Sequence, residues 1–267
     1  TELLKQTVVT AVRQKHLPAR ELKQVNVDTT VQEKNITHPT DSKLLQRAIV
    51  KLARAARQRG IVLRQSYVRV GKRAAVKAGR YAHAQQFKRM RRELRKLRTY
   101  VGRLIRDIQR KAHPLDEALA TLLARCQRVR DQKRNDSNKL YSLHEPDVRC
   151  ISKGKAHKRY EFGQKIALAT TNRRDWFVAA TLCPDNPYDG HTLDRTLQQV
   201  ESITGVKVSD AYVDKGYRGH DYTGPATIHI ACGGAGRSST HLTPTQRKRR
   251  KRRSAIEPKI GHAKSEN

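Results

Sequence analysis

Residues 24–32 read QVNVDTTVQ, and this short stretch decides how the rest of the chain is arranged. Val25, Val27 and Val31 recur in an alternating run of β-branched residues, a composition typical of a strand. Because successive side chains of a strand point to opposite faces, Asp28 lies on the face opposite Val25 and Val27. The sequence therefore predicts a strand with an apolar face and an acid on its other face.

A long helical region follows this strand. From Ser42 to about Arg134, apolar residues recur at spacings of three and four, while Arg and Lys fill the other positions. Asp41 or Ser42 is expected to cap the first helix. The simplest structure for this pattern is a coiled-coil-like helical hairpin, broken at His113-Pro114. The apolar stripes are Leu45, Ile49 and Leu52; Phe87, Met90, Leu94, Leu97, Val101, Leu104 and Ile108; and Leu115, Leu119, Leu122, Cys126 and Val129.

After Asn135 the pattern changes to short strands. Alternating β-formers predict strands, and an amphipathic stretch predicts one short helix between them. The predicted order is strands in 162–171 and 176–184, a loop at 185–193, a helix over 192–203, strands in 206–219 and 226–232, a GGAG turn, and a last helix from about Ser254. This order predicts an α/β core interrupted by a helical insertion.

The composition points to an anionic partner. The chain has 267 residues and a formal net charge of +33, from 57 Lys and Arg against 24 Asp and Glu. Self-repulsion of this size favours a polyanion such as nucleic acid. No apolar run approaches the roughly 18 residues of a membrane-spanning helix, and no signal peptide opens the chain. We expect an intracellular, soluble protein that is not associated with a membrane.

The cysteines and the two ends of the chain add further expectations. Cys126, Cys150, Cys183 and Cys232 stand singly, so we expect reduced thiols and neither a disulfide scaffold nor a zinc ribbon. The chain begins without Met and stops inside a predicted helix, which predicts a fragment of a longer protein.

Three acids stand at core elements and could carry chemistry: Asp28, Asp214 in AYVDKGY, and Glu257 in SAIEP. Magnesium binds carboxylate oxygens held on a rigid frame and bridges to phosphate. Each acid also has a simpler interpretation. Asp28 could solubilise an edge strand, Asp214 could cap a turn, and Glu257 could form a capping box with Ser254.

Three longer motifs carry a family resemblance. Residues 27–45 (VDTTVQEKNITHPTDSKLL), 210–222 (DAYVDKGYRGHDY) and 252–264 (RRSAIEPKIGHAK) together resemble a bacterial insertion-sequence transposase of the DDE type, in the insertion sequence 5 family. The resemblance covers almost the whole chain, and it implies a protein of the bacterial cytoplasm that is associated with the nucleoid. It implies a ribonuclease H-like core, a mixed sheet flanked by helices, with a long all-helical insertion after the first strand.

The resemblance also implies the domain limits. Residues 1–22 would end an amino-terminal helical region, and 23–41 would hold the first core strand and its turn. Residues 42–134 would be the helical insertion, and 135–267 the remainder of the catalytic core, truncated at its carboxyl end.

The implied site is a metal-binding triad of Asp28, Asp214 and Glu257, holding Mg²⁺ or alternatively Mn²⁺. The family signature is Tyr, two residues, Arg, three residues, Glu, six residues, Lys. Arg253, Glu257 and Lys264 keep the last three places, and Arg250 replaces the tyrosine. Independently of the family, this spacing puts the carboxylate and two cations on roughly one face of a helix.

Several basic and aromatic residues are predicted to contact DNA. Between residues 247 and 264, cations would contact DNA phosphates. On the turn after Asp214, cations or an aromatic ring would contact a DNA strand. The run of seven positive side chains at 247–253 is by default a flexible polycation. The predicted DNA contacts are Arg247, Lys248, Arg250, Arg253, Lys264, Lys215, Tyr217 and Arg218.

Three functions remain open from the sequence. The first is a DNA transposase, in which two metal ions activate water for cleavage and then a 3′ hydroxyl for strand transfer. It would act as a homo-oligomer on terminal inverted repeats and target DNA. The second is a nuclease or resolvase with the same core, and the third a non-catalytic basic nucleic-acid-binding protein. A strand-transfer assay separates the first two, and flanking DNA distinguishes an active element from a remnant.

Overall fold

A computed structural model describes residues 2–112, 116–152, 159–231 and 243–265. The chain divides into two compact units, one formed by residues 1–33 with 163–267 and the other by residues 34–162. We call them the α/β unit and the helical unit. The helical unit thus extends beyond the predicted insertion, 42–134, at both ends.

A mixed sheet forms the centre of the α/β unit. Its middle strand is β1 (Gln24–Glu33), the strand predicted from the valine pattern. It pairs antiparallel with β3 (Tyr160–Thr171), where Asp28 lies opposite Leu168, and parallel with β5 (Asp210–Val213). On the outer sides, β6 (Thr227–Ile230) runs parallel to β5 and β4 (Phe177–Cys183) antiparallel to β3. A short strand missed by the sequence, β2 (Arg149–Ser152), belongs to the helical unit by residue range and pairs with β3, which gives the order β2-β3-β1-β5-β6, with β4 also on β3.

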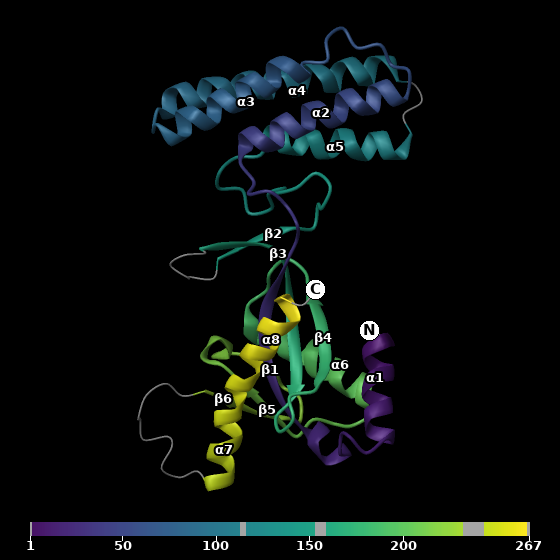
Figure 1. Ribbon diagram of the computed structural model, residues 1–267, viewed down its shortest axis with the longest axis vertical. Coiled ribbons are helices and arrows are strands. Elements are labelled where there is room, and N and C mark those ends of the chain that lie inside the picture. The colour runs from purple at the N-terminus through teal and green to yellow at the C-terminus, as the bar shows by residue number, and fades with distance from the viewer. Residues whose placement is uncertain (1, 113–115, 153–158, 232–242, 266–267) are drawn as a thin grey trace. The chain divides into compact units, whose positions relative to one another are not determined.

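Two helices cover the apolar face of this sheet (Figure 1). These are α1 (Glu2–Arg13), which lies in the predicted amino-terminal helical region, and α6 (Leu193–Thr204), which is close to its predicted range of 192–203. Val25 and Val27 are fully buried and belong to the same core cluster as residues of both helices. The remaining turns of 3₁₀ helix in this unit are η1 (Ala19–Lys23), η2 (Asp189–Thr192) and η3 (Lys215–Tyr217).

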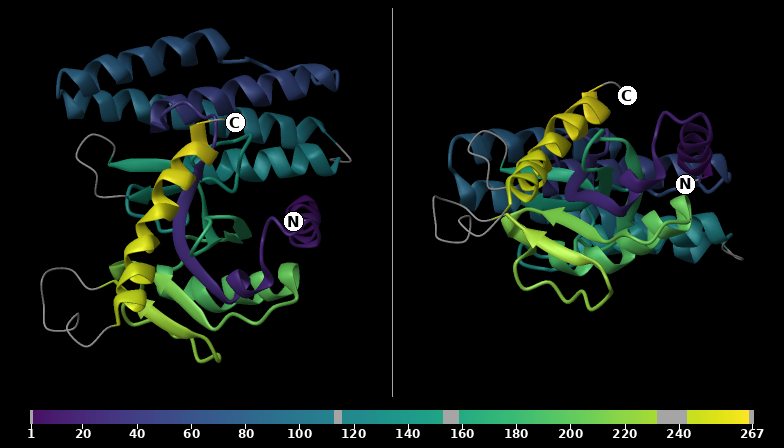
Figure 2. Two further views of the ribbon diagram at one scale, coloured as in Figure 1. Left: turned by 60° about the horizontal axis from the view of Figure 1, so that its bottom comes forward. Right: turned by 90° about the horizontal axis from the view of Figure 1, so that it is seen from below.

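The carboxyl-terminal segment is helical for longer than the sequence suggested. α7 (Pro244–Arg252) passes through a 3₁₀ turn, η5 (Arg253–Ala255), into α8 (Ile256–Ser265). The basic run is therefore a helix, and its interpretation as a flexible polycation is wrong. A reciprocal capping box of Thr243 with Gln246, and a proline in the first turn, start α7 despite the repulsion among its cations. Figure 2 shows this helical segment running beside β1, and α8 packs against that strand.

The helical unit is a four-helix arrangement and not the predicted hairpin (Figure 1). Its helices are α2 (Asp41–Gln58), α3 (Val68–His83), α4 (Phe87–Lys111) and α5 (Glu117–Asp131). The predicted stripes supply most of its core, with Leu45, Ile49 and Leu52 of α2 almost fully buried. Phe87, at the start of the second stripe, is instead exposed, and Leu115 lies outside the described residues. The hairpin was wrong because α2 and α3 are separate helices that both pack on α4.

The buried face of α3 consists of small residues, which let this helix lie close to its neighbours. For this reason the sequence shows no stripe of large apolar residues in α3. Ala74 and Ala78 are buried in the core. A methyl group on Gly71 would lie only 2.9 Å from Cδ1 of Ile49, so a larger side chain there would push α3 away from α2.

The cap of the first helix of this unit differs from the prediction. Thr40, and not Asp41 or Ser42, caps α2, because its side chain accepts a hydrogen bond from the backbone N–H of Lys43.

The predicted break at His113-Pro114, the GGAG turn and Cys232 lie outside the described residues. In the parts of the chain that are described, no helix is both long enough and apolar enough to cross a membrane.

Candidate functional site

Asp28 lies on the partly exposed face of β1, beside acids from distant parts of the chain. Its Oδ1 accepts a hydrogen bond of 2.7 Å from the backbone N–H of Thr29. Burial, followed by the nearby charges of Asp214 and Glu257, raises the pKa of Asp28 to about 6, although Thr29 and Arg253 oppose this shift. The α/β unit therefore brings the three predicted acids within electrostatic reach of one another.

Asp214 follows directly after β5, the strand next to β1. It caps η3, and its Oδ1 accepts a hydrogen bond of 2.8 Å from the backbone N–H of Gly216. The parallel register pairs Gln24 with Asp210 and Asn26 with Tyr212, so two residues further along both strands Asp214 comes beside Asp28. The interpretation of Asp214 as a turn cap is thus correct, and the same position also faces Asp28.

Glu257 stands in the first turn of α8 and is paired with a cation. NH2 of Arg253 donates to its Oε1 at 2.9 Å, and 59% of the Glu257 side chain is exposed. The predicted four-residue spacing of these two side chains on one helical face is confirmed. Ser254 instead donates to the backbone carbonyl of Lys251, so no capping box with Glu257 forms through that hydroxyl.

The acids fit a divalent cation in ligand type and in charge, but not as a finished three-ligand site. Carboxylates that raise one another's pKa are relieved by a cation between them. Among the residues that the structure describes, however, no three acidic, histidine or cysteine side chains lie close enough together to hold a metal ion. Asp28 and Asp214 would hold such an ion, and Glu257 would join only after turning away from Arg253.

A fourth acid, Asp189, lies beside this group and was missed by the sequence interpretation. Its Oδ1 accepts hydrogen bonds from Oγ1 of Thr29 at 2.8 Å and from Nζ of Lys165 at 2.6 Å. A methyl group on Gly216 would lie 3.0 Å from Asp214 Oδ1 and 3.3 Å from Asp189 Oδ2, so both carboxylates crowd the same glycine. Asp189 stands in a segment that the sequence indicates only as a loop, and no pattern in that loop singles it out.

Of the three predicted DNA contacts on the turn after Asp214, one is buried and two are exposed. Tyr217 is fully buried in the α/β core, so its ring is not available to stack on DNA as predicted. Burial, together with the charges of Asp28, Asp189 and Asp214, raises the pKa of Tyr217 well above its usual value. Lys215 and Arg218, on the same turn, are exposed.

Two further predicted residues are Arg250 in α7 and Arg253 in η5, and Arg253 lies near both Asp28 and Glu257. Within the described residues, Nε of Arg250 and NH1 of Arg253 are buried and have no hydrogen-bond partner. A buried cationic N–H without a partner costs free energy, which an incoming oxyanion would remove. Arg247 and Lys248 lie earlier on α7, while Lys264 lies near the end of α8.

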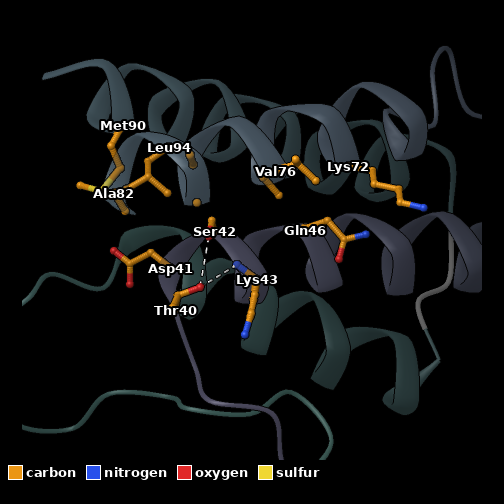
Figure 3. A pocket seen from close by; sticks show the side chains of 13 residues that line it. Thr40, Asp41, Ser42, Lys43, Gln46, Lys72, Val76, Ala82, Met90 and Leu94 are labelled. Carbon is orange, nitrogen blue, oxygen red and sulfur yellow. Dashed lines mark hydrogen bonds between the residues drawn. The ribbon is translucent and has the colours of Figure 1, made fainter. Parts of the chain in front are cut away.

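A cavity in the helical unit holds no comparable chemistry. It has a volume of about 650 Å³ and lies between α2, α3 and α4. Figure 3 shows the apolar side chains of Val76, Met90 and Leu94 on one side and Asp41 on the other. Asp41 is the single carboxylate of its lining, and it pairs with Arg98 at 3.6 Å. The acids of the α/β unit therefore remain the candidate site.

Comparisons with known proteins give a partial match. No family model matches the chain, and no solved structure matches it. A Rhizobium meliloti protein described as "Uncharacterized protein ORF8 in nfe locus" is 56% identical over 86 residues, which cover 32% of this chain. The chain thus spans less than half of that relative, 42% of its length, and is similar to it over this segment.

Proposed function

We propose that this chain is the catalytic part of a DNA transposase of the DDE type, related to the insertion sequence 5 family. It would cleave DNA at terminal inverted repeats and join the freed end to target DNA. The observation that carries the proposal is the raised pKa of Asp28, caused by its burial and then by Asp214 and Glu257. A carboxyl group whose ionisation is disfavoured by burial and by two other acids is more typical of a functional site than of a structural framework.

The fold supports this proposal. Asp28 stands on the middle strand of a mixed sheet, Asp214 follows the neighbouring parallel strand, and Glu257 comes from a helix packed on β1. A mixed sheet flanked by helices, with a helical segment after its first strand, agrees with the coarse architecture that a ribonuclease H-like core implies.

Each acid has its own task in the proposed site. With a pKa of about 6, Asp28 is mostly ionised at neutral pH. Asp214 is held by the Gly216 N–H before DNA arrives, whereas Glu257 is held on Arg253 and would have to leave it to join the metal. When bound, Mg²⁺ or Mn²⁺ supplies an activated water or 3′ hydroxyl and stabilises the leaving oxygen. Lys165 neutralises Asp189, which keeps that carboxylate from repelling DNA.

Cations beside the acids would hold the strand. The unpartnered N–H groups of Arg250 and Arg253 are suited to the oxygens of a phosphodiester. Binding of a phosphate by Arg253 would also compete with its contact to Glu257, which would free that carboxylate for the metal. DNA binding and completion of the acid site would then be coupled.

The test is a metal-dependence and joining assay on the full chain. Supercoiled plasmid is incubated with a labelled 3′-hydroxyl oligonucleotide in Mg²⁺, in Mn²⁺ or in chelator. We expect metal-dependent nicking and transfer of label to the plasmid, both abolished by Glu257→Ala while DNA binding is kept or slightly strengthened. Nicking without joining would favour the nuclease, and normal activity of a folded Glu257→Ala protein would contradict the proposed site.

Asp194→Ala is the matched control. Asp194 is an exposed acid of the same unit, and its Oδ2 accepts only a side-chain hydrogen bond, from Gln198. Asp210 would be a poor control, because it accepts hydrogen bonds from Ser209 and His229 and thereby ties β5 to β6. Activity of the Asp194→Ala protein should match that of the unchanged chain.

A further inference from the structure

A second cavity lies in the α/β unit and is strongly basic. Its volume is about 410 Å³, and cations from η1, from the turn between β3 and β4, and from α7 surround it. Its lining holds five Lys or Arg side chains and a single carboxylate, and consists of Arg20, Glu21, Gln24, Asn172, Arg173, Thr245, Lys248, Arg249 and Arg252. So many like charges around one cavity repel one another unless an anion enters it.

The wall of this cavity is built by buried amides. Nδ2 of Asn172 donates to Oδ1 of Asn26 at 2.7 Å and to the backbone carbonyl of Arg249 at 3.0 Å. Nδ2 of Asn26 donates in turn to the carbonyl of Arg252 at 3.3 Å, and Nε of Arg252 donates to the carbonyl of Asn172 at 2.9 Å. These bonds fix α7 against the sheet, so the cations of its last turns keep their positions.

The carboxylate in the wall does not neutralise all of these cations. Glu21, whose side chain is 5% exposed, lies 3.6 Å from Arg173 and 3.4 Å from Arg174. Within the described residues, neither of its oxygens has a hydrogen-bond partner, and no carboxylate pairs with Arg20, Lys248 or Arg249. Glu21 thus pairs with the two arginines of the turn, and it does not neutralise Arg20, Lys248 or Arg249.

The cavity and the acids share one face of β1. Gln24, Asn26 and Asp28 point to the same side, because side chains of a strand alternate. Four residues of strand separate Gln24 from Asp28, a distance of about 13 Å at ~3.3 Å per residue. A few nucleotides of one DNA strand span such a distance, so the same strand could contact both places.

We propose that this cavity binds a backbone phosphate of the DNA strand on which the acids act, a few nucleotides away from the bond that is cut. The inference rests on the proposed function for the identity of the strand, but the binding itself needs neither metal nor cleavage. Phosphate contacts of this kind set the register of a strand without reading its sequence.

The first test compares two double variants of the full chain. Arg20→Ala with Lys248→Ala removes two cations of the cavity, and Lys5→Ala with Lys207→Ala removes two exposed cations elsewhere in the same unit. Binding of a fluorescent single-stranded oligonucleotide is measured by anisotropy over a series of salt concentrations, without divalent metal. We expect the cavity variant to lower the slope of log affinity against log salt by about 0.7 for each lost contact, and the control to leave it nearly unchanged. Equal changes in both would overturn the proposal.

The second test leaves the protein unchanged and so does not depend on the folding of a variant. A single neutral methylphosphonate linkage is moved along the oligonucleotide, one position at a time. The cavity predicts one linkage whose neutralisation weakens binding by the unchanged chain but not by the Arg20→Ala, Lys248→Ala variant. The same loss in both proteins would contradict the inference. Inorganic phosphate should compete with the oligonucleotide more strongly than chloride at matched ionic strength, and equal competition would count against a phosphate site.

These results separate this inference from the proposed function. If binding by the unchanged chain depends on one linkage, binding by the cavity variant does not, and the unchanged chain never cleaves DNA, then the phosphate site is supported and the transposase is refuted. If the unchanged chain cleaves DNA but its binding depends on no single linkage, then the transposase is supported and the phosphate site is refuted.

Discussion

Asp107 of the helical unit and Asp28 of the α/β unit are aspartates with opposite surroundings. Asp107 accepts a hydrogen bond of 2.9 Å from the backbone N–H of Arg64 and pairs with Lys111 at 3.1 Å, and these contacts lower its pKa. Asp116 behaves in the same way, since Arg59 and the N–H of Leu119 lower its pKa to about 2. Asp28 instead has its pKa raised to about 6 by burial and by two other acids.

Under the proposed function, this difference separates acids that stabilise the fold from acids that would bind a metal ion. In the helical unit, which is rich in Lys and Arg, carboxylates hold loops and helix starts through cationic and N–H partners. In the α/β unit the same residue type is placed where its charge is unfavourable, although many cations are available nearby. Such an arrangement costs stability, and a bound cation would offset the cost.

The largest effect should be on catalysis. Asp28→Ala should lower DNA cleavage by at least about 10³-fold, because residues that act as one unit lose most of their activity together. Asp107→Ala should leave the activity of the folded protein within about twofold. Both are measured by plasmid nicking at a temperature well below unfolding. Equal losses in the two variants would remove the distinction between the two groups of acids.

The next effect is on the free energy of unfolding, which should increase when the charge of Asp28 is removed. Asp28→Asn should stabilise the protein at pH 8 by at most about 3 kcal/mol, at ~1.36 kcal/mol per pKa unit. The folded pKa of Asp28 lies above its unfolded value of 3.8, so native stability falls as pH rises from about 4 through about 6. The gain from Asn should therefore disappear below pH 4. Urea unfolding at several pH values measures it, and a destabilised Asp28→Asn protein at pH 8 would contradict the account.

Removing an acid of the helical unit should have the opposite sign. Asp107→Ala leaves the Arg64 N–H without its partner and should destabilise the protein by about 1–3 kcal/mol at neutral pH. Because the folded pKa of Asp107 is lowered, its contribution is present above the unfolded pKa and is lost as pH falls below about 4. The same urea series checks this, and a loss that persisted undiminished in acid would show that the carboxylate charge is not responsible.

Asp189 sharpens the comparison, because it lies beside the acids but is paired as in the helical unit. Asp189→Asn keeps the size of the side chain but weakens its pairing with Lys165. We expect cleavage to fall about tenfold, as for residues that orient ligating groups. Lys165→Met should reproduce the loss if the pair acts through position, and an unchanged rate in both variants would leave Asp189 without a role.

Much of this arrangement could be predicted from local patterns. Alternation of Val25 and Val27 predicted β1 and placed Asp28 on the opposite face, and the stripe from Leu94 to Ile108 predicted α4. The four-residue spacing of Arg253 and Glu257 predicted that they share a helical face, on which they in fact form a hydrogen bond. These features depend on side-chain periodicity within one element, which a sequence displays directly.

The rest depended on contacts between distant segments. α3 was missed because its buried face consists of Gly71, Ala74 and Ala78, and small residues give a weak apolar signal. Charge alone suggested that the basic run is flexible, whereas the cap at Thr243 and the amides of Asn26 and Asn172 hold it as a helix on the sheet. Asp189 stands in a loop, and only its approach to Thr29 brings it to the acids.

The most direct test of the central claim is manganese binding, followed by the electron paramagnetic resonance signal of free Mn²⁺. The account predicts that the unchanged chain removes Mn²⁺ from solution at neutral pH, and that Asp28→Asn, Asp214→Asn and Glu257→Gln each weaken this binding. Asp107→Asn, the matched change in the helical unit, should bind as the unchanged chain does. Binding that is absent from the unchanged chain with and without DNA, or that falls equally in Asp28→Asn and Asp107→Asn, would contradict the account.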